Sequence, residues 1–383
     1  MKKTGKRICL TIPVLLMAVL AGIYVSGGVA GQSGALVREG LQAEFTASDY
    51  NDVSGEKADA QIELKGNTGT ISDTTRGSSG STVTIARKGI YRVSGEAENV
   101  TILVEDTKES GNVYLILDHV TMTNTSACIV AEAVDQLIIQ CVGENTLTST
   151  APEKAVIFSR DDLTINGEGS LNLISGESGI VCNDTLRITG AVMNIEAEND
   201  GLKANDALYM DGGLVNVAKS YEGIEACDMV LVDGEINICA SDDGINLSGE
   251  LEDEGDILVS GGSLYISSGG DGIDSNHSIF IEGGKVFIEG PENNRNSIMD
   301  KGDAADAVLS ISGGTVCAIG SAEKAKAFDS GTQYARLENI SGKAGETISV
   351  DDGTGLSFTA SQDFDCVIYS SPTFTEESGI TIE

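Results

Sequence analysis

Acidic residues recur at one phase through the middle of this chain. They directly precede a glycine and then an isoleucine or leucine, in the phrases Asp200-Gly201-Leu202, Glu222-Gly223-Ile224, Asp243-Gly244-Ile245 and Asp271-Gly272-Ile273. A second, mostly polar series lies two positions after each glycine and consists of Lys203, Glu225, Asn246, Asp274 and, in the next period, Asp300. Carboxylate and amide oxygens are the ligands that Ca²⁺ prefers, in sets of about six to eight. These series could therefore hold a metal if the fold brings equal phases together.

The spacing of the phrases indicates how the chain could do so. Counting from Gly179, the glycines are separated by 22, 22, 21 and 28 residues, and an insert at residues 249–256 explains the long step. Each period also has a second glycine turn followed by a strand of alternating apolar residues, as in Gly212 before Val215-Asn216-Val217. An array of hairpins would not keep one residue type in one phase, whereas stacked coils would. The repeat predicts an all-β fold, a right-handed, single-stranded parallel β-helix with coils about 4.8 Å apart.

The periodic pattern divides the chain into four parts. We expect the β-helix at 80–335, a linker and capping segment at 31–79, and a small C-terminal β cap at 336–383 that covers the last exposed edge. Residues 1–30 carry a basic start and an uncharged run at 8–25, which predict either a signal peptide or an N-terminal membrane anchor. The protein is therefore expected outside the cell or at the cell surface.

Charge and cysteine content exclude several classes of protein. The chain has 24 Lys and Arg against 59 Asp and Glu, a net charge of -35, so its surface repels nucleic acid and anionic lipid. We expect a monomer that meets the membrane only through its N-terminal segment. Seven cysteines follow the targeting segment, an odd number without C-x-x-C spacing, so we interpret them as core residues with at most one or two disulfides.

Stacking would place like charges directly above one another, which destabilises a sheet unless something neutralises them. Calcium is the cofactor that these oxygens predict. Its expected ligands are Asp200, Glu222, Glu225, Asp243, Asn246, Asp271, Asp274 and Asp300. The alternative is turn chemistry, because Asp-Gly is favoured in tight turns for backbone reasons alone.

Several phrases resemble a known family. They are GIYRVSG at 89–95, VYLILDHVTMT at 113–123, DDLTING at 161–167, SDDGIN at 241–246, GDGIDSN at 270–276 and SGGTV at 312–316. Together they resemble the bacterial carbohydrate-binding β-helix proteins of clostridia, whose fold is related to that of pectate lyases. The resemblance runs from about residue 80 to 383 and implies binding of polysaccharides such as cellulose or polygalacturonate. Glu222 departs from the usual Asp of this family.

Residues that could do catalysis are sparse. The chain has only two histidines, His119 and His277, and no lysine or arginine stands in a supporting constellation. We therefore expect a non-catalytic protein, with a calcium-dependent polysaccharide lyase and a structural surface or adhesin stalk as alternatives. The candidate sugar-binding residues are Lys203, Tyr221 and Arg295, and Tyr265 and Phe287 are further aromatic candidates near the acids.

Overall fold

The structure is a computed structural model that describes residues 41–105, 111–249, 254–291, 295–331, 334–375 and 377–383. Within these ranges the regular structure is entirely strand, and no helix there is long and apolar enough to cross a membrane. The predicted signal peptide or anchor at residues 1–30 lies outside the described residues.

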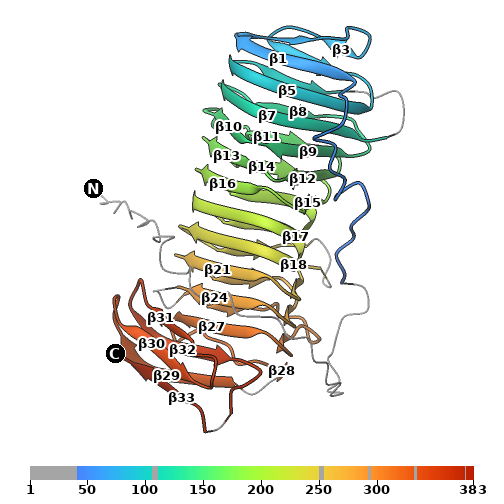
Figure 1. Ribbon diagram of the computed structural model, residues 1–383. Helices are drawn as coiled ribbons and strands as arrows, with labels where there is room; N and C mark the ends of the chain where they lie inside the picture. The colour runs from blue at the N-terminus through green and yellow to red at the C-terminus, as the bar shows by residue number, and fades with distance from the viewer. Residues whose placement is uncertain (1–40, 106–110, 250–253, 292–294, 332–333, 376) are drawn as a thin grey trace, which may run out of the picture.

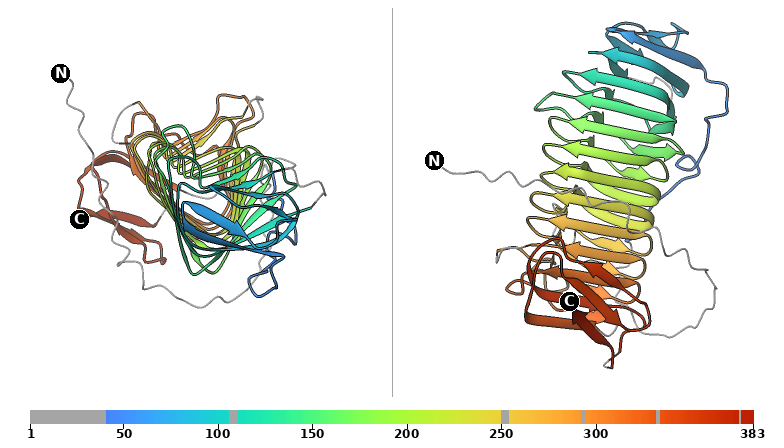
Figure 2. Two further views of the ribbon diagram at one scale, coloured as in Figure 1. Left: turned by 90° about the horizontal axis from the view of Figure 1, so that it is seen from above. Right: turned by 60° about the vertical axis from the view of Figure 1, so that its left-hand side comes forward.

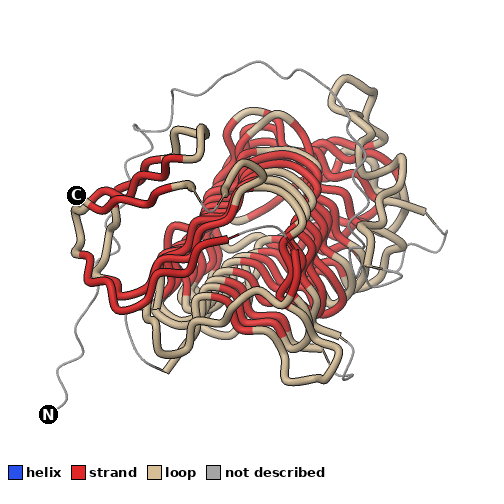
Figure 3. Tube along the Cα trace, turned by 90° about the horizontal axis from the view of Figure 1, so that it is seen from below, coloured by secondary structure: helices blue, strands red, loops and turns tan. Residues whose placement is uncertain are grey.

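The strands stack as parallel coils (Figures 1 and 2). Leu186 pairs with Leu208, Leu208 with Met229 and Met229 with Ile257, so residues one repeat apart are direct neighbours. Viewed along the axis, the coils superpose around a common centre (Figure 3). The parallel β-helix predicted from the repeat is confirmed.

Each coil contributes to three faces. Face 1 consists of β4 (Thr82–Ile85), β6 (Thr101–Val104), β8 (Ile129–Ala131), β11 (Ile157–Ser159), β14 (Ile180–Cys182), the start of β17 (Leu202–Ser220), the start of β18 (Ile224–Ala240), β19 (Ile245–Leu247), β22 (Ile273–Ser275) and β25 (Met299–Asp300). Face 2 consists of the first halves of β5 (Gly89–Glu98) and β7 (Val113–Asn124), then β9 (Leu137–Val142), β12 (Leu163–Gly167), β15 (Leu186–Ile188), the middle of β17 and β18, β20 (Ile257–Val259), β23 (Ile279–Ile281), β26 (Leu309–Ile311) and β28 (Ser330–Gly331). Face 3 consists of the second halves of β5 and β7, then β10 (Glu144–Ser149), β13 (Ser170–Ser175), β16 (Val192–Ala197), the ends of β17 and β18, β21 (Ser263–Ser268), β24 (Lys285–Glu289) and β27 (Thr315–Gly320).

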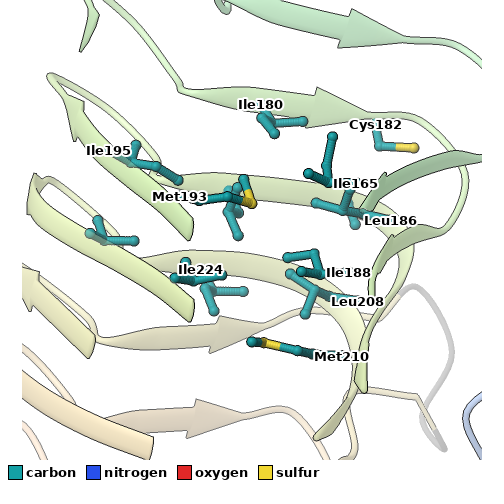
Figure 4. Packing of buried hydrophobic residues seen from close by; sticks show 14 of the residues in the cluster. Ile165, Ile180, Cys182, Leu186, Ile188, Met193, Ile195, Leu208, Met210 and Ile224 are labelled. Atoms are coloured by element: carbon teal, nitrogen blue, oxygen red, sulfur yellow. The ribbon is translucent and has the colours of Figure 1, made fainter. Parts of the chain in front are cut away.

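Aliphatic side chains fill the centre of the coils. Leu186, Ile188, Leu208 and Met210 point inward from consecutive coils and are fully buried (Figure 4). Because strand side chains alternate between faces, the period-2 pattern puts these residues inside and leaves polar neighbours outside. Each such side chain contributes about 1.5–3 kcal/mol through burial, so the core can hold the outer residues in strict register.

The β-helix starts earlier than residue 80. Strand β1 (Ala60–Gly66) pairs in parallel with β5, and it also pairs antiparallel with β2 (Thr68–Ile71). A short β3 (Gly77–Ser78) pairs with β4. The predicted boundary is wrong because the first coil has no glycine phrase, although its alternating AQIELKG pattern buries Ile62 and Leu64.

Residues 41–53, which we name the strap, are not a linker. The strap runs along the outside of face 2 (Figure 1), where Leu41 belongs to a buried apolar cluster with Val230, Leu258 and Phe280. The fully buried Asp49 carboxylate accepts hydrogen bonds from Gln136 Nε2 at 2.6 Å and Thr164 Oγ1 at 2.5 Å. These outward polar groups need partners once they are covered, and the strap supplies them.

Antiparallel strands close the C-terminal end. Strand β32 (Phe364–Ser370) pairs antiparallel with β27 and with β29 (Tyr334–Gly342). A separate sheet consists of β30 (Thr347–Asp351), β31 (Ser357–Thr359) and β33 (Gly379–Ile382). Reversing the strand direction ends the parallel stack and covers its last edge, as a β cap requires.

Candidate functional site

A column of glycines marks the corner between face 3 and face 1. The Gly201 N–H donates to the Glu222 carbonyl at 3.0 Å, and the Gly223 N–H donates to the Asp243 carbonyl at 3.0 Å. A Cβ on Gly201 would lie 2.6 Å from the Gly223 oxygen, and one on Gly223 would lie 2.3 Å from the Gly244 oxygen. Neither Gly201 nor Gly223 has a positive φ. The glycines are therefore needed for the close approach of neighbouring coils and not for a left-handed turn.

The two predicted polar columns both form. The first places Asp200, Glu222, Asp243 and Asp271 one coil apart, since the glycine after each bonds to the next coil. The second is fixed by strand register, in which Lys203 pairs with Glu225, Glu225 with Asn246, Asn246 with Asp274 and Asp274 with Asp300.

Side-chain conformations divide these columns into two carboxylate clusters. Cluster 1 is Asp200, Glu222 and Glu225, and cluster 2 is Asp243, Asp271 and Asp274. Within each cluster, one oxygen from every member lies within 4.8 Å of the others. Asn246 stands between the clusters and donates its Nδ2 to both Glu222 oxygens at 3.2 Å. Such an oxygen-only donor set suits a hard divalent cation such as calcium.

Burial makes ionisation of these acids unfavourable. Burial raises the pKa of Asp200 to about 6 and that of Glu222 to about 7, and repulsion from Glu225 adds to both shifts. In cluster 2, burial raises the pKa of Asp243 to about 6 and that of Asp271 to about 7. A bound cation would remove this penalty, because an opposite charge favours the ionised form.

Some of the acids also have protein partners. The Asp243 carboxylate accepts the Asp271 backbone N–H at 2.6 Å, and the Asp271 carboxylate accepts the Ser297 N–H. Each bond links neighbouring coils, so these acids have a structural role as well. Each of these hydrogen bonds uses one oxygen of the accepting carboxylate. Because a carboxylate has about four lone-pair sites, both acids keep sites for a cation.

Two basic residues neutralise part of the second column. Lys203 Nζ lies 2.6 Å from Glu225 Oε2, and Lys326 is ion-paired with Asp300. Lys203 is therefore engaged by cluster 1, which leaves it poorly placed as the predicted sugar contact. Asp300 belongs to neither cluster of three acids. Burial is the main cause of the raised pKa of Asp274, and the charge of Asp300 raises that pKa further.

The other predicted sugar contacts lie at the exposed corner. Tyr221 precedes Glu222 and is 48% exposed. Arg295 is exposed and comes two residues before Ser297, whose N–H binds Asp271. Tyr221 and Arg295 are therefore close in sequence to members of clusters 1 and 2 respectively, and the Tyr221 side chain is hydrogen-bonded to Asp242.

The further aromatic candidates, Tyr265 and Phe287, lie elsewhere. Their rings stack with centroids 5.1 Å apart and planes 8° apart, in the middle of face 3 rather than at the acidic corner. Phe287 packs against the C-terminal strands through a cluster that includes Val350 and Tyr369. Sequence distance along a coil does not show which face a strand belongs to, and the structure places these two rings on face 3.

Face 3 also has an asparagine ladder that the sequence did not single out. Asn194 Nδ2 donates to Asn172 Oδ1 at 2.8 Å, Asn216 to Asn194 at 3.0 Å and Asn237 to Asn216 at 2.8 Å. The signal was present in the sequence, since each Asn is the middle residue of an apolar-Asn-apolar strand.

The histidines have structural environments. His277 is buried, and its Nδ1 lies 2.7 Å from Asp256 Oδ1. His119 is exposed and lies 2.8 Å from Asp118. Neither histidine belongs to either of the two carboxylate clusters.

Fold and site together define a parallel β-helix protein with paired carboxylate clusters on one corner. The chain belongs to the family described as carbohydrate-binding domain-containing proteins, whose family model matches residues 79–229 and 214–354. The resemblance seen in the sequence is thereby confirmed.

Two known proteins are similar to this chain. A carbohydrate-binding domain-containing protein of Acetivibrio thermocellus is 35% identical over 129 residues, which is 30% of this chain and 45% of that protein. The match thus spans less than half of that relative. A solved structure, titled as the polysaccharide lyase-like protein from C. thermocellum in a gadolinium derivative, is 26% identical with a TM-score of 0.48, and covers 72% of this chain and 99% of its own.

Proposed function

We propose that this protein is an exported, calcium-dependent and non-catalytic carbohydrate-binding protein that recognises acidic plant-type polysaccharide. The observation that carries the proposal is the pair of clusters of three carboxylates on one corner of a carbohydrate-binding β-helix. The location outside the cell rests on the sequence of residues 1–30.

The donor chemistry of both clusters fits calcium. Asp200, Glu222 and Glu225 would hold one ion, and Asp243, Asp271 and Asp274 would hold another. When bound, calcium would neutralise these acids and supply open positions for the carboxylates of a uronate chain. Without a cation, a protein of net charge -35 repels an anionic polysaccharide.

The corner itself supplies the remaining contacts. Tyr221 directly precedes Glu222 of cluster 1 and offers an exposed ring on which a sugar face can stack. Arg295 is exposed and comes two residues before Ser297, whose N–H binds Asp271 of cluster 2, and a guanidinium can bind a carboxylate in a bidentate manner. Since coils repeat about every 4.8 Å, an extended chain can contact several coils along this corner.

Retention on polygalacturonate tests the proposal. We expect strong retention in calcium, a steep fall in EDTA, and weaker retention of Asp271→Asn than of wild type in calcium. The Asn side chain keeps an oxygen for the Ser297 N–H, so the substitution removes charge while sparing this bond. Glu168→Gln is the matched control, because Glu168 is exposed and outside both clusters.

Three outcomes would contradict the proposal. Retention that is equal in calcium and EDTA would remove the metal from recognition. An unsaturated uronide product would make the protein a lyase. Failure to retain any polysaccharide at any calcium concentration would leave the surface stalk as the better interpretation.

A further inference from the structure

A cavity of about 380 Å³ lies at the N-terminal end of the β-helix. It is at the corner between β4 and β5, and its lining includes Asp59, Arg76, Arg87, Lys88, Asn112 and Tyr114. Its volume falls within the range of about 300–1,000 Å³ that is typical of small-ligand sites. Three of the chain's 24 basic residues, Arg76, Arg87 and Lys88, line this one cavity.

The acid in this wall is already engaged. Arg76 Nη2 donates to Asp59 Oδ1 at 3.0 Å, and Arg76 Nη1 donates to the Lys88 carbonyl at 3.1 Å. The other Asp59 oxygen accepts the Ile90 N–H at 2.9 Å. Asp73, outside the lining, accepts bonds from the backbone and hydroxyl of Thr75, and its Oδ2 lies 3.8 Å from Arg76 Nε. The charge of Arg76 is thus compensated by Asp59 and Asp73, and Arg87 supplies a further guanidinium to the wall.

The rest of the lining suits a sugar ring. Tyr114 is on face 2 of β7, is partly exposed, and presents an aromatic surface to the cavity. Asn112 adds an amide that can donate to and accept from hydroxyl groups, and its Nδ2 is oriented by Gln136 Oε1 at 3.0 Å. Cations for a carboxylate, an aromatic face for a pyranose and an amide for hydroxyls together form the recognition set for a sugar acid.

We infer that this cavity binds a single uronate sugar without calcium. The inference rests on the proposed function, since it assigns a second contact with the same class of polysaccharide. The cavity is remote from cluster 1: on face 1, five pairing steps separate Thr84, next to the cavity corner, from Lys203. At about 4.8 Å per coil the separation along the axis is roughly 24 Å. The cavity also lies at the corner between faces 1 and 2, whereas cluster 1 lies at the corner between faces 3 and 1, so the two sites are separate.

Binding of D-galacturonate in EDTA, followed by ligand-observed NMR and calorimetry on the full chain, tests the inference. We expect weak saturable binding by wild type, roughly 10-fold weaker binding by Arg87→Ala, and weaker binding by Tyr114→Ala. D-Galactose, which lacks the carboxylate, should bind at least about 10-fold less tightly. Lys154→Ala is the matched control, because it removes an exposed positive charge outside the cavity.

The outcomes separate this site from the calcium site. No galacturonate binding in EDTA, equal affinity for galactose, or unchanged affinity in both Arg87→Ala and Tyr114→Ala would overturn the inference. None of these results affects calcium-dependent retention on polygalacturonate, which Asp271→Asn tests. Conversely, loss of the calcium effect would leave binding of the single sugar in the cavity intact. Unchanged melting curves of the variants show that the loss is local.

Discussion

The charge of Asp271 should have opposite effects on stability with and without calcium. The Asp271 carboxylate is packed against the other members of cluster 2, and burial raises its pKa from 3.8 to about 7. Replacing Asp271 by Asn removes the charge, keeps an oxygen for the Ser297 N–H, and turns an NH₂ group toward the neighbouring carboxylates. The variant should therefore be more stable than wild type in EDTA and gain less from calcium.

The size of the effect follows from the pKa shift. A rise of roughly three pKa units costs up to about 4 kcal/mol for the ionised native state near pH 8, at about 1.36 kcal/mol for each unit. Partial exposure and relaxation reduce this to about 1–2 kcal/mol. For a chain of this size, that corresponds to a melting temperature about 1–3 °C higher in EDTA. Calcium at about 100 times its dissociation constant stabilises wild type by about 2.7 kcal/mol per site. Asp271→Asn should lose most of this calcium-dependent stabilisation at cluster 2.

The same argument predicts the pH dependence. In EDTA the native state binds more protons than the unfolded chain, because the pKa values of Glu222 and Asp271 in the folded protein are above those in the unfolded one. The stability that these two acids contribute is therefore present at low pH and is lost as pH rises from about 4 to about 7. Lowering the pH from about 8 to about 5 should raise the melting temperature of wild type and reduce its difference from Asp271→Asn.

Thermal unfolding of both proteins in calcium and in EDTA is the assay, with Glu168→Gln as the control for an exposed charge. The reasoning is refuted if Asp271→Asn is no more stable than wild type in EDTA near pH 8. It is refuted equally if calcium leaves the melting temperature of wild type unchanged.

Two further predictions concern the scaffold. Gly223→Ala should destabilise the protein by about 1–3 kcal/mol, because its Cβ would lie 2.3 Å from the Gly244 oxygen. The control, Gly379→Ala, has open space around it and should change stability little. Equal melting temperatures of the two variants would contradict the argument that neighbouring coils approach closely at Gly223. Asp49→Ala should lower the free energy of unfolding by about 1–3 kcal/mol and make the strap sensitive to protease, because Gln136 and Thr164 lose their buried acceptor. The control, Tyr50→Phe, removes an exposed hydrogen bond and should have a small effect. A strap that stays resistant to protease in Asp49→Ala would show that apolar contacts alone hold it.

The repeat determined the fold and the columns. A period of about 22 residues with one residue type in one phase is compatible with stacked coils, and stacking then places Asp200 and Glu222 in one column. The Asn246–Asp274–Asp300 register follows from the same periodicity, because inward side chains on either side lock each strand to the next. Local repetition carried this information, so it could be interpreted from sequence alone.

Tertiary structure decided everything that depends on side-chain direction or on distant segments. The division into two clusters depends on the direction in which each carboxylate turns, and Lys203 joins cluster 1 because its flexible chain reaches Glu225. The strap reaches Thr164 across more than 100 residues, and Tyr114 and Arg76 line one cavity that no periodicity marks. Such contacts are set by the packing of non-repeated segments, whose energy has no signature in a local pattern of residues.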